Sequence, residues 1–106
     1  MTSYLLIESR DPFDSADTGF CRDLAVQLAG AGHRVTLFLV QNGVLPARAG
    51  CRGAGFAELA RAGVEVLADD FSLRERAIER LEPEVKASPI DLVIDRMADG
   101  CKLIWH

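Results

Sequence analysis

The stretch AGAGHRVTLFLV, residues 29–40, predicts the end of a helix followed by a buried strand. Gly30 and Gly32 stand where a helix should stop, because glycine readily adopts the left-handed conformation that closes many helices. Residues 33–40 are the strand candidate, and within them 35–40 form an almost continuous apolar run, with Thr36 inside it, instead of an alternation of apolar and polar side chains. Such a run is typical of a strand that is covered on both faces.

Four other segments have the composition of strands, and helical spacing fills the gaps between them. The strand candidates are YLLIES (4–9), VEVLA (64–68), IDLVID (90–95) and KLIWH (102–106). Strands that alternate with helices along a chain indicate a parallel sheet with helices on both sides. We therefore predict an α/β protein, a three-layer α/β/α sandwich with a mostly parallel five-stranded sheet.

Apolar residues at helical intervals predict three helices and a final turn. Asp17 or Thr18 can cap the first helix. Ser72 and Glu75 have the spacing of a capping box at the start of the third helix, which Pro83 stops. The apolar stripes are Phe20, Leu24 and Leu28 in the first helix, Phe56, Leu59 and Ala60 in the second, and Leu73, Ala77 and Leu81 in the third, and the final turn is expected at 96–100.

The size and charge of the chain restrict its function. A chain of 106 residues is expected to form one domain, 1–106, around one core. Its net charge is -4 and its basic residues are scattered singly, which speaks against nucleic-acid binding. The longest apolar run is far shorter than the roughly 20 residues that cross a bilayer, so no membrane span is expected. The sequence begins without the features of an export signal, so we expect a cytoplasmic protein.

The three cysteines, Cys21, Cys51 and Cys101, are widely spaced and form no C-x-x-C pair. No histidine stands at ligand spacing from them, so neither a metal site nor a disulfide framework is expected. Cys21 falls at helical spacing with Ala25 and is expected to be buried. Cys101 is a candidate for a second, exposed thiol, and His106 is expected to be solvated.

Cys51 lies in RAGCRGAG, residues 48–55, between Arg48 and Arg52. Nearby cations and the free N–H groups that open a helix stabilise a thiolate, which is the reactive form of cysteine. The stretch follows the second predicted strand, and loops at the carboxyl ends of parallel strands gather at one edge and build the site. Two interpretations stay open: a reactive thiol, or an inert small residue in a flexible loop.

Two motifs that suggest other functions fail on spacing. The glycines of GCRGAG follow the pattern G-x-x-G-x-G after the second predicted strand, whereas the dinucleotide-binding pattern is G-x-G-x-x-G after the first. Asp69 and Asp70 end the third predicted strand, as phosphoacceptor aspartates do in receiver domains, but no lysine ends the fifth. The acidic pair is therefore interpreted as a solvated loop that leads into the Ser72 cap.

Four short motifs follow one another along the chain: a DP loop, a helix ending in AGH, a strand running into NGV, and a third strand introduced by AGV. In this order and spacing they resemble the DsrE/DsrF/TusD family of small sulfur-relay proteins. The segments that carry the resemblance are RDPFDSADTGF (10–20), LAGAGHRVTLFLVQNGVLPAR (28–48) and LARAGVEVLADDFSLRERAI (59–78), so it spans nearly the whole chain.

The resemblance implies a Rossmann-like sandwich, homo- or hetero-oligomers in the cytoplasm, and persulfide transfer through a cysteine with no metal or organic cofactor. In sulfur-carrying members the working cysteine usually follows the third strand. Here Asp69 takes that place, so the family's cysteine has no counterpart at this position and Asp69 counts among the candidate binding residues.

Two functions follow from this departure. In the first, Cys51 relays persulfide sulfur between a protein donor and a protein acceptor, with Arg48 or Arg52 steadying the anion. In the second, the chain is a non-catalytic oligomeric binding or assembly module that holds a small anion or a protein partner through Asn42, Gly43 and the 48–55 loop.

Overall fold

The computed structural model describes residues 2–12, 18–51 and 55–106 of the chain. The strands are β1 (Ser3–Glu8), β2 (Arg34–Leu39), β3 (Val64–Asp69), β4 (Val85–Ser88) and β5 (Lys102–Trp105). The helices are α1 (Thr18–Gly30), the 3-10 helix η1 (Gln41–Ala47), α2 (Phe56–Arg61), α3 (Asp70–Glu75) and α4 (Asp91–Ala98). Arg52 and Asp17, which the sequence analysis singled out, lie outside the described residues.

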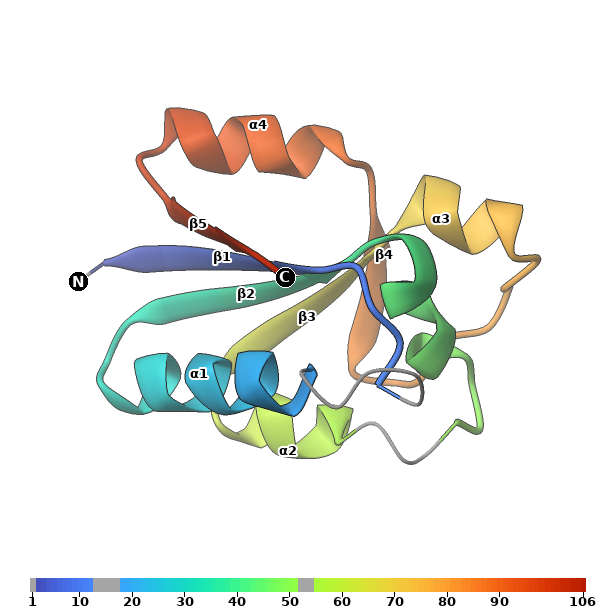
Figure 1. Cartoon of the computed structure of the whole chain (residues 1–106), viewed down its shortest axis with the longest axis horizontal. Coiled ribbons are helices and arrows are strands. Elements are labelled where there is room, and N and C mark those ends of the chain that lie inside the picture. Colours follow the sequence, from blue (N-terminus) through green and yellow to red (C-terminus); the bar gives the residue numbers. More distant parts are fainter. Residues whose placement is uncertain (1, 13–17, 52–54) are drawn as a thin grey trace.

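All five strands are parallel and form one sheet in the order β4-β3-β2-β1-β5 (Figure 1). The chain steps outward from β1 to β4 and then returns over the sheet to place β5 on the other side of β1. The direction of the connections therefore reverses at β1. In open α/β sheets, ligands bind at the carboxyl ends of the strands near such a reversal.

Helices cover both faces of the sheet, which confirms the predicted three layers. In Figure 1, α1 and α2 lie below the sheet and α4 lies above it. Leu6, Leu37 and Val66 belong to the core cluster that includes buried residues of α1 and α2, whereas Leu5 and Phe38 belong to the cluster against α4. Side chains alternate along a strand, so a strand with apolar neighbours on both faces is apolar throughout.

The prediction of a strand at 90–95 is wrong, because these residues begin and form most of α4. The fourth strand is instead β4, VKAS, in which Val85 is the only buried residue. Leu92 and Val93 of α4 pack on the sheet, while Ile94 is 68% exposed. The prediction failed because adjacent apolar residues in 90–95 have the pattern of a buried strand, so the helical spacing of the segment was not recognised.

Helix α1 forms where it was predicted, but a different stripe is buried. Cys21 and Ala25 are buried, and Leu24 and Leu28 pack partly against the core. Phe20, expected to belong to this stripe, is 72% exposed. The cysteine and the alanine, rather than the phenylalanine, let α1 pack closely on the sheet.

The third helix is shorter than predicted. α3 ends at Glu75, so Ala77 and Leu81 lie beyond it. α2 agrees better with its prediction: Phe56 and Leu59 are buried, although Ala60 is exposed.

Candidate functional site

The segment that leads to Cys51 begins at the carboxyl end of β2, as predicted, and turns at once into η1. The N–H of Gln41 donates to Ser72 Oγ over 2.9 Å, and the N–H of Gly43 donates to Val40 O over 2.9 Å. Gly43 is buried against the end of β1, where a Cβ atom would come within 2.2 Å of Glu8 O. Only glycine fits at this close approach. Gly43 therefore has a packing role in the described structure.

Asn42, a predicted binding residue, holds an arginine from a distant part of the chain. Its Oδ1 accepts hydrogen bonds from Arg76 Nε and Nη2 over 3.3 and 3.1 Å. A further bond runs from Arg76 Nη1 to Ser72 O over 3.2 Å. The side chain of Asn42 thus fixes a guanidinium group that sequence reasoning did not single out.

Asp69 is a buried helix cap and not part of a solvated loop. Its Oδ2 accepts hydrogen bonds from Ser72 N and Ser72 Oγ over 3.1 and 2.7 Å. Asp69 is the N-cap of α3, so the predicted Ser72 cap is also wrong. The other oxygen, Oδ1, is buried with no hydrogen-bond partner. Where the resembled family carries its cysteine, this chain has a carboxylate that starts a helix.

A short antiparallel bridge holds the chain just before Cys51. Arg48 pairs with Leu81 across the bridge. The N–H of Ala49 donates to Arg80 O over 2.9 Å, and the N–H of Glu82 donates to Ala47 O over 2.8 Å. These bonds dock the end of η1 against residues 80–82 and set the path of the chain into Cys51.

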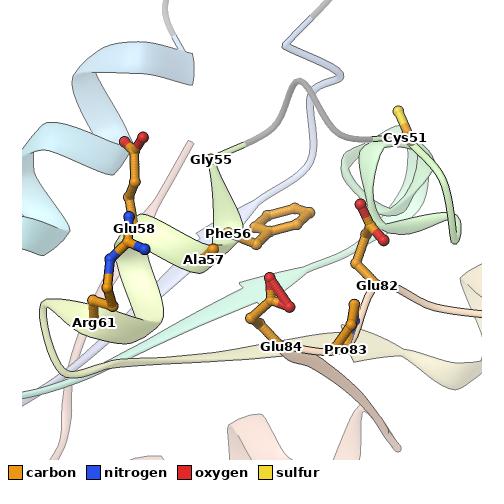
Figure 2. A pocket seen from close by; sticks show the side chains of 9 residues that line it. All are labelled: Cys51, Gly55, Phe56, Ala57, Glu58, Arg61, Glu82, Pro83 and Glu84. Carbon is orange, nitrogen blue, oxygen red and sulfur yellow. The ribbon is translucent and has the colours of Figure 1, made fainter.

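Cys51 is half-buried on the rim of a cavity of about 380 Å³. Figure 2 shows the cavity between α2 and residues 82–84, with the sulfur of Cys51 at its upper edge. Among the described residues, three carboxylates, Glu58, Glu82 and Glu84, line the cavity together with one guanidinium, Arg61. This described part of the lining is acidic, and it favours a positively charged partner at the mouth.

Arg48 does not line the Cys51 cavity. Its Nε donates to Leu45 O over 2.8 Å, and its side chain lines a separate groove. The structure therefore places Arg48 and Cys51 on different hollows, although only two residues separate them. Arg52 lies outside the described residues.

The other two thiols are buried. Cys21 is 3% exposed, and burial, with a smaller contribution from the charge of Glu8, raises its pKa to about 11. Cys101 is 9% exposed, and burial raises its pKa also, so the expectation of an exposed thiol there is wrong. Since a thiol with a raised pKa stays protonated at neutral pH, neither residue is suited to act as a nucleophile.

The sequence analysis expects a solvated His106, and this expectation is wrong. The His106 side chain instead pairs with a buried carboxylate. Its Nδ1 lies 2.6 Å from Glu8 Oε2, and Glu8 is 2% exposed. The N–H of His106 donates to Ile7 O over 2.8 Å, and its carbonyl accepts from the N–H of Ser9 over 3.0 Å. Sequence reasoning missed this pair because it depends on β5 lying beside β1.

Comparisons with known proteins bear on the fold. No protein-family profile matches the chain, and no curated protein matches its sequence. The solved structure of the ychN protein from E. coli matches with a TM-score of 0.87 at 16% identity, over 100% of both chains. MTH1491, a protein of unknown function from Methanobacterium thermoautotrophicum, matches with a TM-score of 0.80 at 19% identity, over 99% of this chain and 98% of that one.

A third structure, the conserved protein of unknown function BT1422 from Bacteroides thetaiotaomicron, has a TM-score of 0.76 at 14% identity, over 98% of this chain and 95% of its own. These likenesses establish the fold. Identities this low leave function to be argued from the site itself. Within the described residues, no helix has the length and apolar character needed to cross a bilayer.

Proposed function

We propose that this protein is a DsrE-like cytoplasmic protein of sulfur metabolism in which Cys51 carries persulfide sulfur. Cys51 supports this role because it is the accessible thiol: Cys21 and Cys101 are both buried. The order of the family motifs along the chain supports the assignment to sulfur chemistry, and the likeness to the ychN protein supports the α/β fold on which that assignment depends.

The proposed reaction is a transfer of one sulfur atom between thiols. The Cys51 thiolate attacks the outer sulfur of a donor persulfide, R–S–SH, and forms Cys51–S–SH. The sulfur–sulfur bond of the donor breaks, and the donor leaves as the thiolate R–S⁻. A thiolate of the acceptor then attacks the outer sulfur of Cys51–S–SH and releases the Cys51 thiolate. Neither transfer consumes an oxidant or a reductant, and neither requires a metal or an organic cofactor.

The carboxylates of the Cys51 cavity bear on the identity of the donor and the acceptor. Glu58, Glu82 and Glu84 repel a small anionic donor and attract a protein that presents its cysteine among lysines and arginines. We therefore infer that both the sulfur donor and the sulfur acceptor are proteins, and that each has a basic surface around its reacting thiol.

Intact mass after treatment with a polysulfide tests this function. The parent protein is expected to gain about 32 Da, the mass of one sulfur atom, as a persulfide that a reducing agent removes. Cys51→Ser is expected to gain nothing, and Cys101→Ser serves as the control that keeps the gain. A parent protein that forms no adduct while folded, or a Cys51→Ser variant that still forms one, would overturn the role of Cys51.

A second candidate is a non-catalytic assembly module of the same fold, and one surface favours it. The α4–β5 surface consists of two apolar residues of α4, the apolar N-cap residue that precedes it, and two apolar residues of β5, all exposed. Leu103 and Trp105 pair with Leu5 and Ile7 in the sheet, so they face the same side as α4. None of the residues of α4 is buried. The five members are Ile90, Ile94, Met97, Leu103 and Trp105.

The α4–β5 surface fits a second copy of this chain. Ile90, Ile94 and Met97 are spaced as one helical stripe, and Ile94 lies near its middle. An antiparallel copy of α4 can therefore set Ile94 against Ile94 and Ile90 against Met97, which is the self-matching arrangement of a two-fold interface. Exposed aromatic residues and Met are enriched in protein interfaces, which fits Trp105 and Met97.

A further inference from the structure

A second hollow, here called the arginine groove, lies beside residues 48–49 and has a volume of about 490 Å³. Its lining comes from two segments, 48–49 and 76–80, and it shares no lining residue with the Cys51 cavity. Arg48 and Arg76 are the C-cap residues of η1 and α3, but helix capping does not explain why both lie in one hollow together with Arg80.

The groove concentrates positive charge. Three guanidinium groups, those of Arg48, Arg76 and Arg80, and one carboxylate, that of Glu79, line it. Its lining thus carries two net positive charges, although the chain as a whole has a net charge of -4. Glu75 Oε1 lies 3.8 Å from Arg76 Nη1, which is longer than a hydrogen bond. Like charges gathered in one hollow repel one another, and an anion between them removes that repulsion.

Two of the arginines are held in place before any ligand binds. Asn42 Oδ1 and Ser72 O accept hydrogen bonds from all three nitrogens of the Arg76 guanidinium, over 3.1 to 3.3 Å. Leu45 O accepts from Arg48 Nε over 2.8 Å, which leaves the two terminal nitrogens of Arg48 available. Fixed guanidinium groups lose little conformational freedom on binding, so their contacts contribute more to affinity.

The backbone brings these arginines together from distant parts of the chain. Ala77 turns the chain after α3 with a positive φ of 55°, and residues 78–80 then run toward the bridge. There the N–H of Ala49 bonds to Arg80 O, and Arg48 stands opposite Leu81. The groove therefore depends on main-chain hydrogen bonds, which give it a defined shape.

We propose that the arginine groove binds a dianionic phosphate group, either that of a small phosphate monoester or inorganic phosphate itself. Guanidinium groups donate paired hydrogen bonds to the oxygens of such anions. The volume lies within the range of roughly 300–1,000 Å³ typical of small-molecule sites. Ala49, Ala77 and Ile78 also line the groove and provide an apolar surface for an organic part of the ligand. This proposal stands independently of sulfur transfer at Cys51.

Titration monitored by NMR tests the groove with two probes, inorganic phosphate and phenyl phosphate, at an ionic strength held constant with sodium chloride. Saturable shifts are expected at the Nε–H signals of Arg48, Arg76 and Arg80 and at the amides of Ala49 and Ala77. Arg48→Gln and Arg80→Gln are each expected to weaken binding about tenfold, because each removes a hydrogen bond to a charged group. Both side chains are exposed, so these variants should fold.

Two control variants separate the groove from other effects. Arg74→Gln removes an arginine of α3 that pairs with Asp70 over 3.7 Å and does not line the groove, so binding should be unchanged. Cys51→Ser should also bind as the parent does, whether or not it accepts sulfur. Tighter binding of phenyl phosphate supports an ester as ligand, and tighter binding of inorganic phosphate supports the free ion. Absence of saturable shifts with both probes, or an equal loss of binding in Arg74→Gln, would overturn the proposal.

Discussion

Ala77 occupies a backbone position that usually belongs to glycine. Its N–H donates to Arg74 O over 3.1 Å, and the N–H of Ile78 donates to Leu73 O over 2.9 Å. This pair of bonds is the Schellman arrangement that closes a helix, and the residue at its turn has a positive φ. Alanine is a strong helix former, so the spacing of Leu73 and Ala77 predicts that α3 continues. The prediction fails because no glycine marks the end of the helix.

Replacing Ala77 by glycine should stabilise the protein. The left-handed conformation costs an alanine roughly 1 kcal/mol more than a glycine, so Ala77→Gly is expected to raise the free energy of unfolding by up to about 1 kcal/mol. Urea unfolding measures the change. Ala60→Gly, at an exposed position of α2, should lower the same quantity by about 1 kcal/mol. A loss of stability in both variants would contradict the strain assigned to Ala77.

Individual site residues differ in how far the sequence could predict them. The placement of Asn42 and Cys51 after the second strand followed from local signals: the strand ends, and polar residues and glycines begin. Arg76 and Arg80 could not be found in this way, because Arg76 reaches the groove through the end of α3 and its bonds to Asn42, and Arg80 through the turn at Ala77 and the bridge to residues 47–49. No local spacing in the sequence records those long-range contacts.

Among the elements, β4 and α4 were the hardest to predict. β4 has four residues, two of them exposed, so it lacks the apolar run that identified β1 and β2. α4 contains a cluster of β-branched residues, which favour strands when taken alone. Its helical signals are Asp91 in the first turn and Arg96 in the last, and they favour a helix because they complement the helix dipole.

A hydrogen-bonded triad fastens α4 to the sheet. Arg96 Nη1 donates to Thr36 Oγ1 over 2.8 Å, and Arg96 Nη2 donates to Glu65 Oε1 over 3.1 Å. Thr36 Oγ1 in turn donates to Glu65 Oε1 over 3.0 Å. Burial alone would raise the pKa of Glu65, but the hydrogen bonds from Arg96 and Thr36 outweigh it and lower this pKa below its ordinary value of 4.5.

Acid should therefore loosen α4. A carboxylate with a lowered pKa stabilises the folded state above its unfolded pKa, and this contribution is lost as the pH falls below 4.5 and through the folded pKa. Hydrogen exchange of the α4 amides is expected to accelerate over this range relative to those of α1. In Arg96→Met the α4 amides should exchange faster already at neutral pH and lose this acid dependence. Equal pH dependence of α4 in the parent and the variant would contradict the role of the triad.

For the whole molecule, the layered architecture was predictable and the strand order was not. Continuous apolar runs, such as residues 35–40, required neighbours on both faces of the sheet, and the structure places α1 and α4 on opposite sides. The position of β5 beside β1 has no such signal, because residues 102–105 could pair at either edge. The Glu8–His106 pair, which depends on this order, could not be predicted for the same reason.

The α4–β5 surface determines what association of the whole molecule to expect. If two copies meet there, Ile94→Asp places a charge at the centre of the contact and should shift the protein to a smaller species in analytical ultracentrifugation. Phe20→Asp is the matched control, because Phe20 is equally exposed but lies on α1, on the other face of the sheet. A parent protein that sediments as a monomer at high concentration, or an equal effect of both variants, would contradict assembly through this surface.

The strand order also affects how the chain acquires its structure during synthesis. β1 leaves the ribosome before the other strands of this sheet, and one of its two neighbours, β5, leaves after them. Until residues 102–105 have emerged, one side of β1 keeps backbone N–H and C=O groups that another nascent chain could capture. The nascent chain is therefore prone to aggregate during this interval. A chaperone bound to the open edge of β1 would protect it, and slow translation would lengthen the interval.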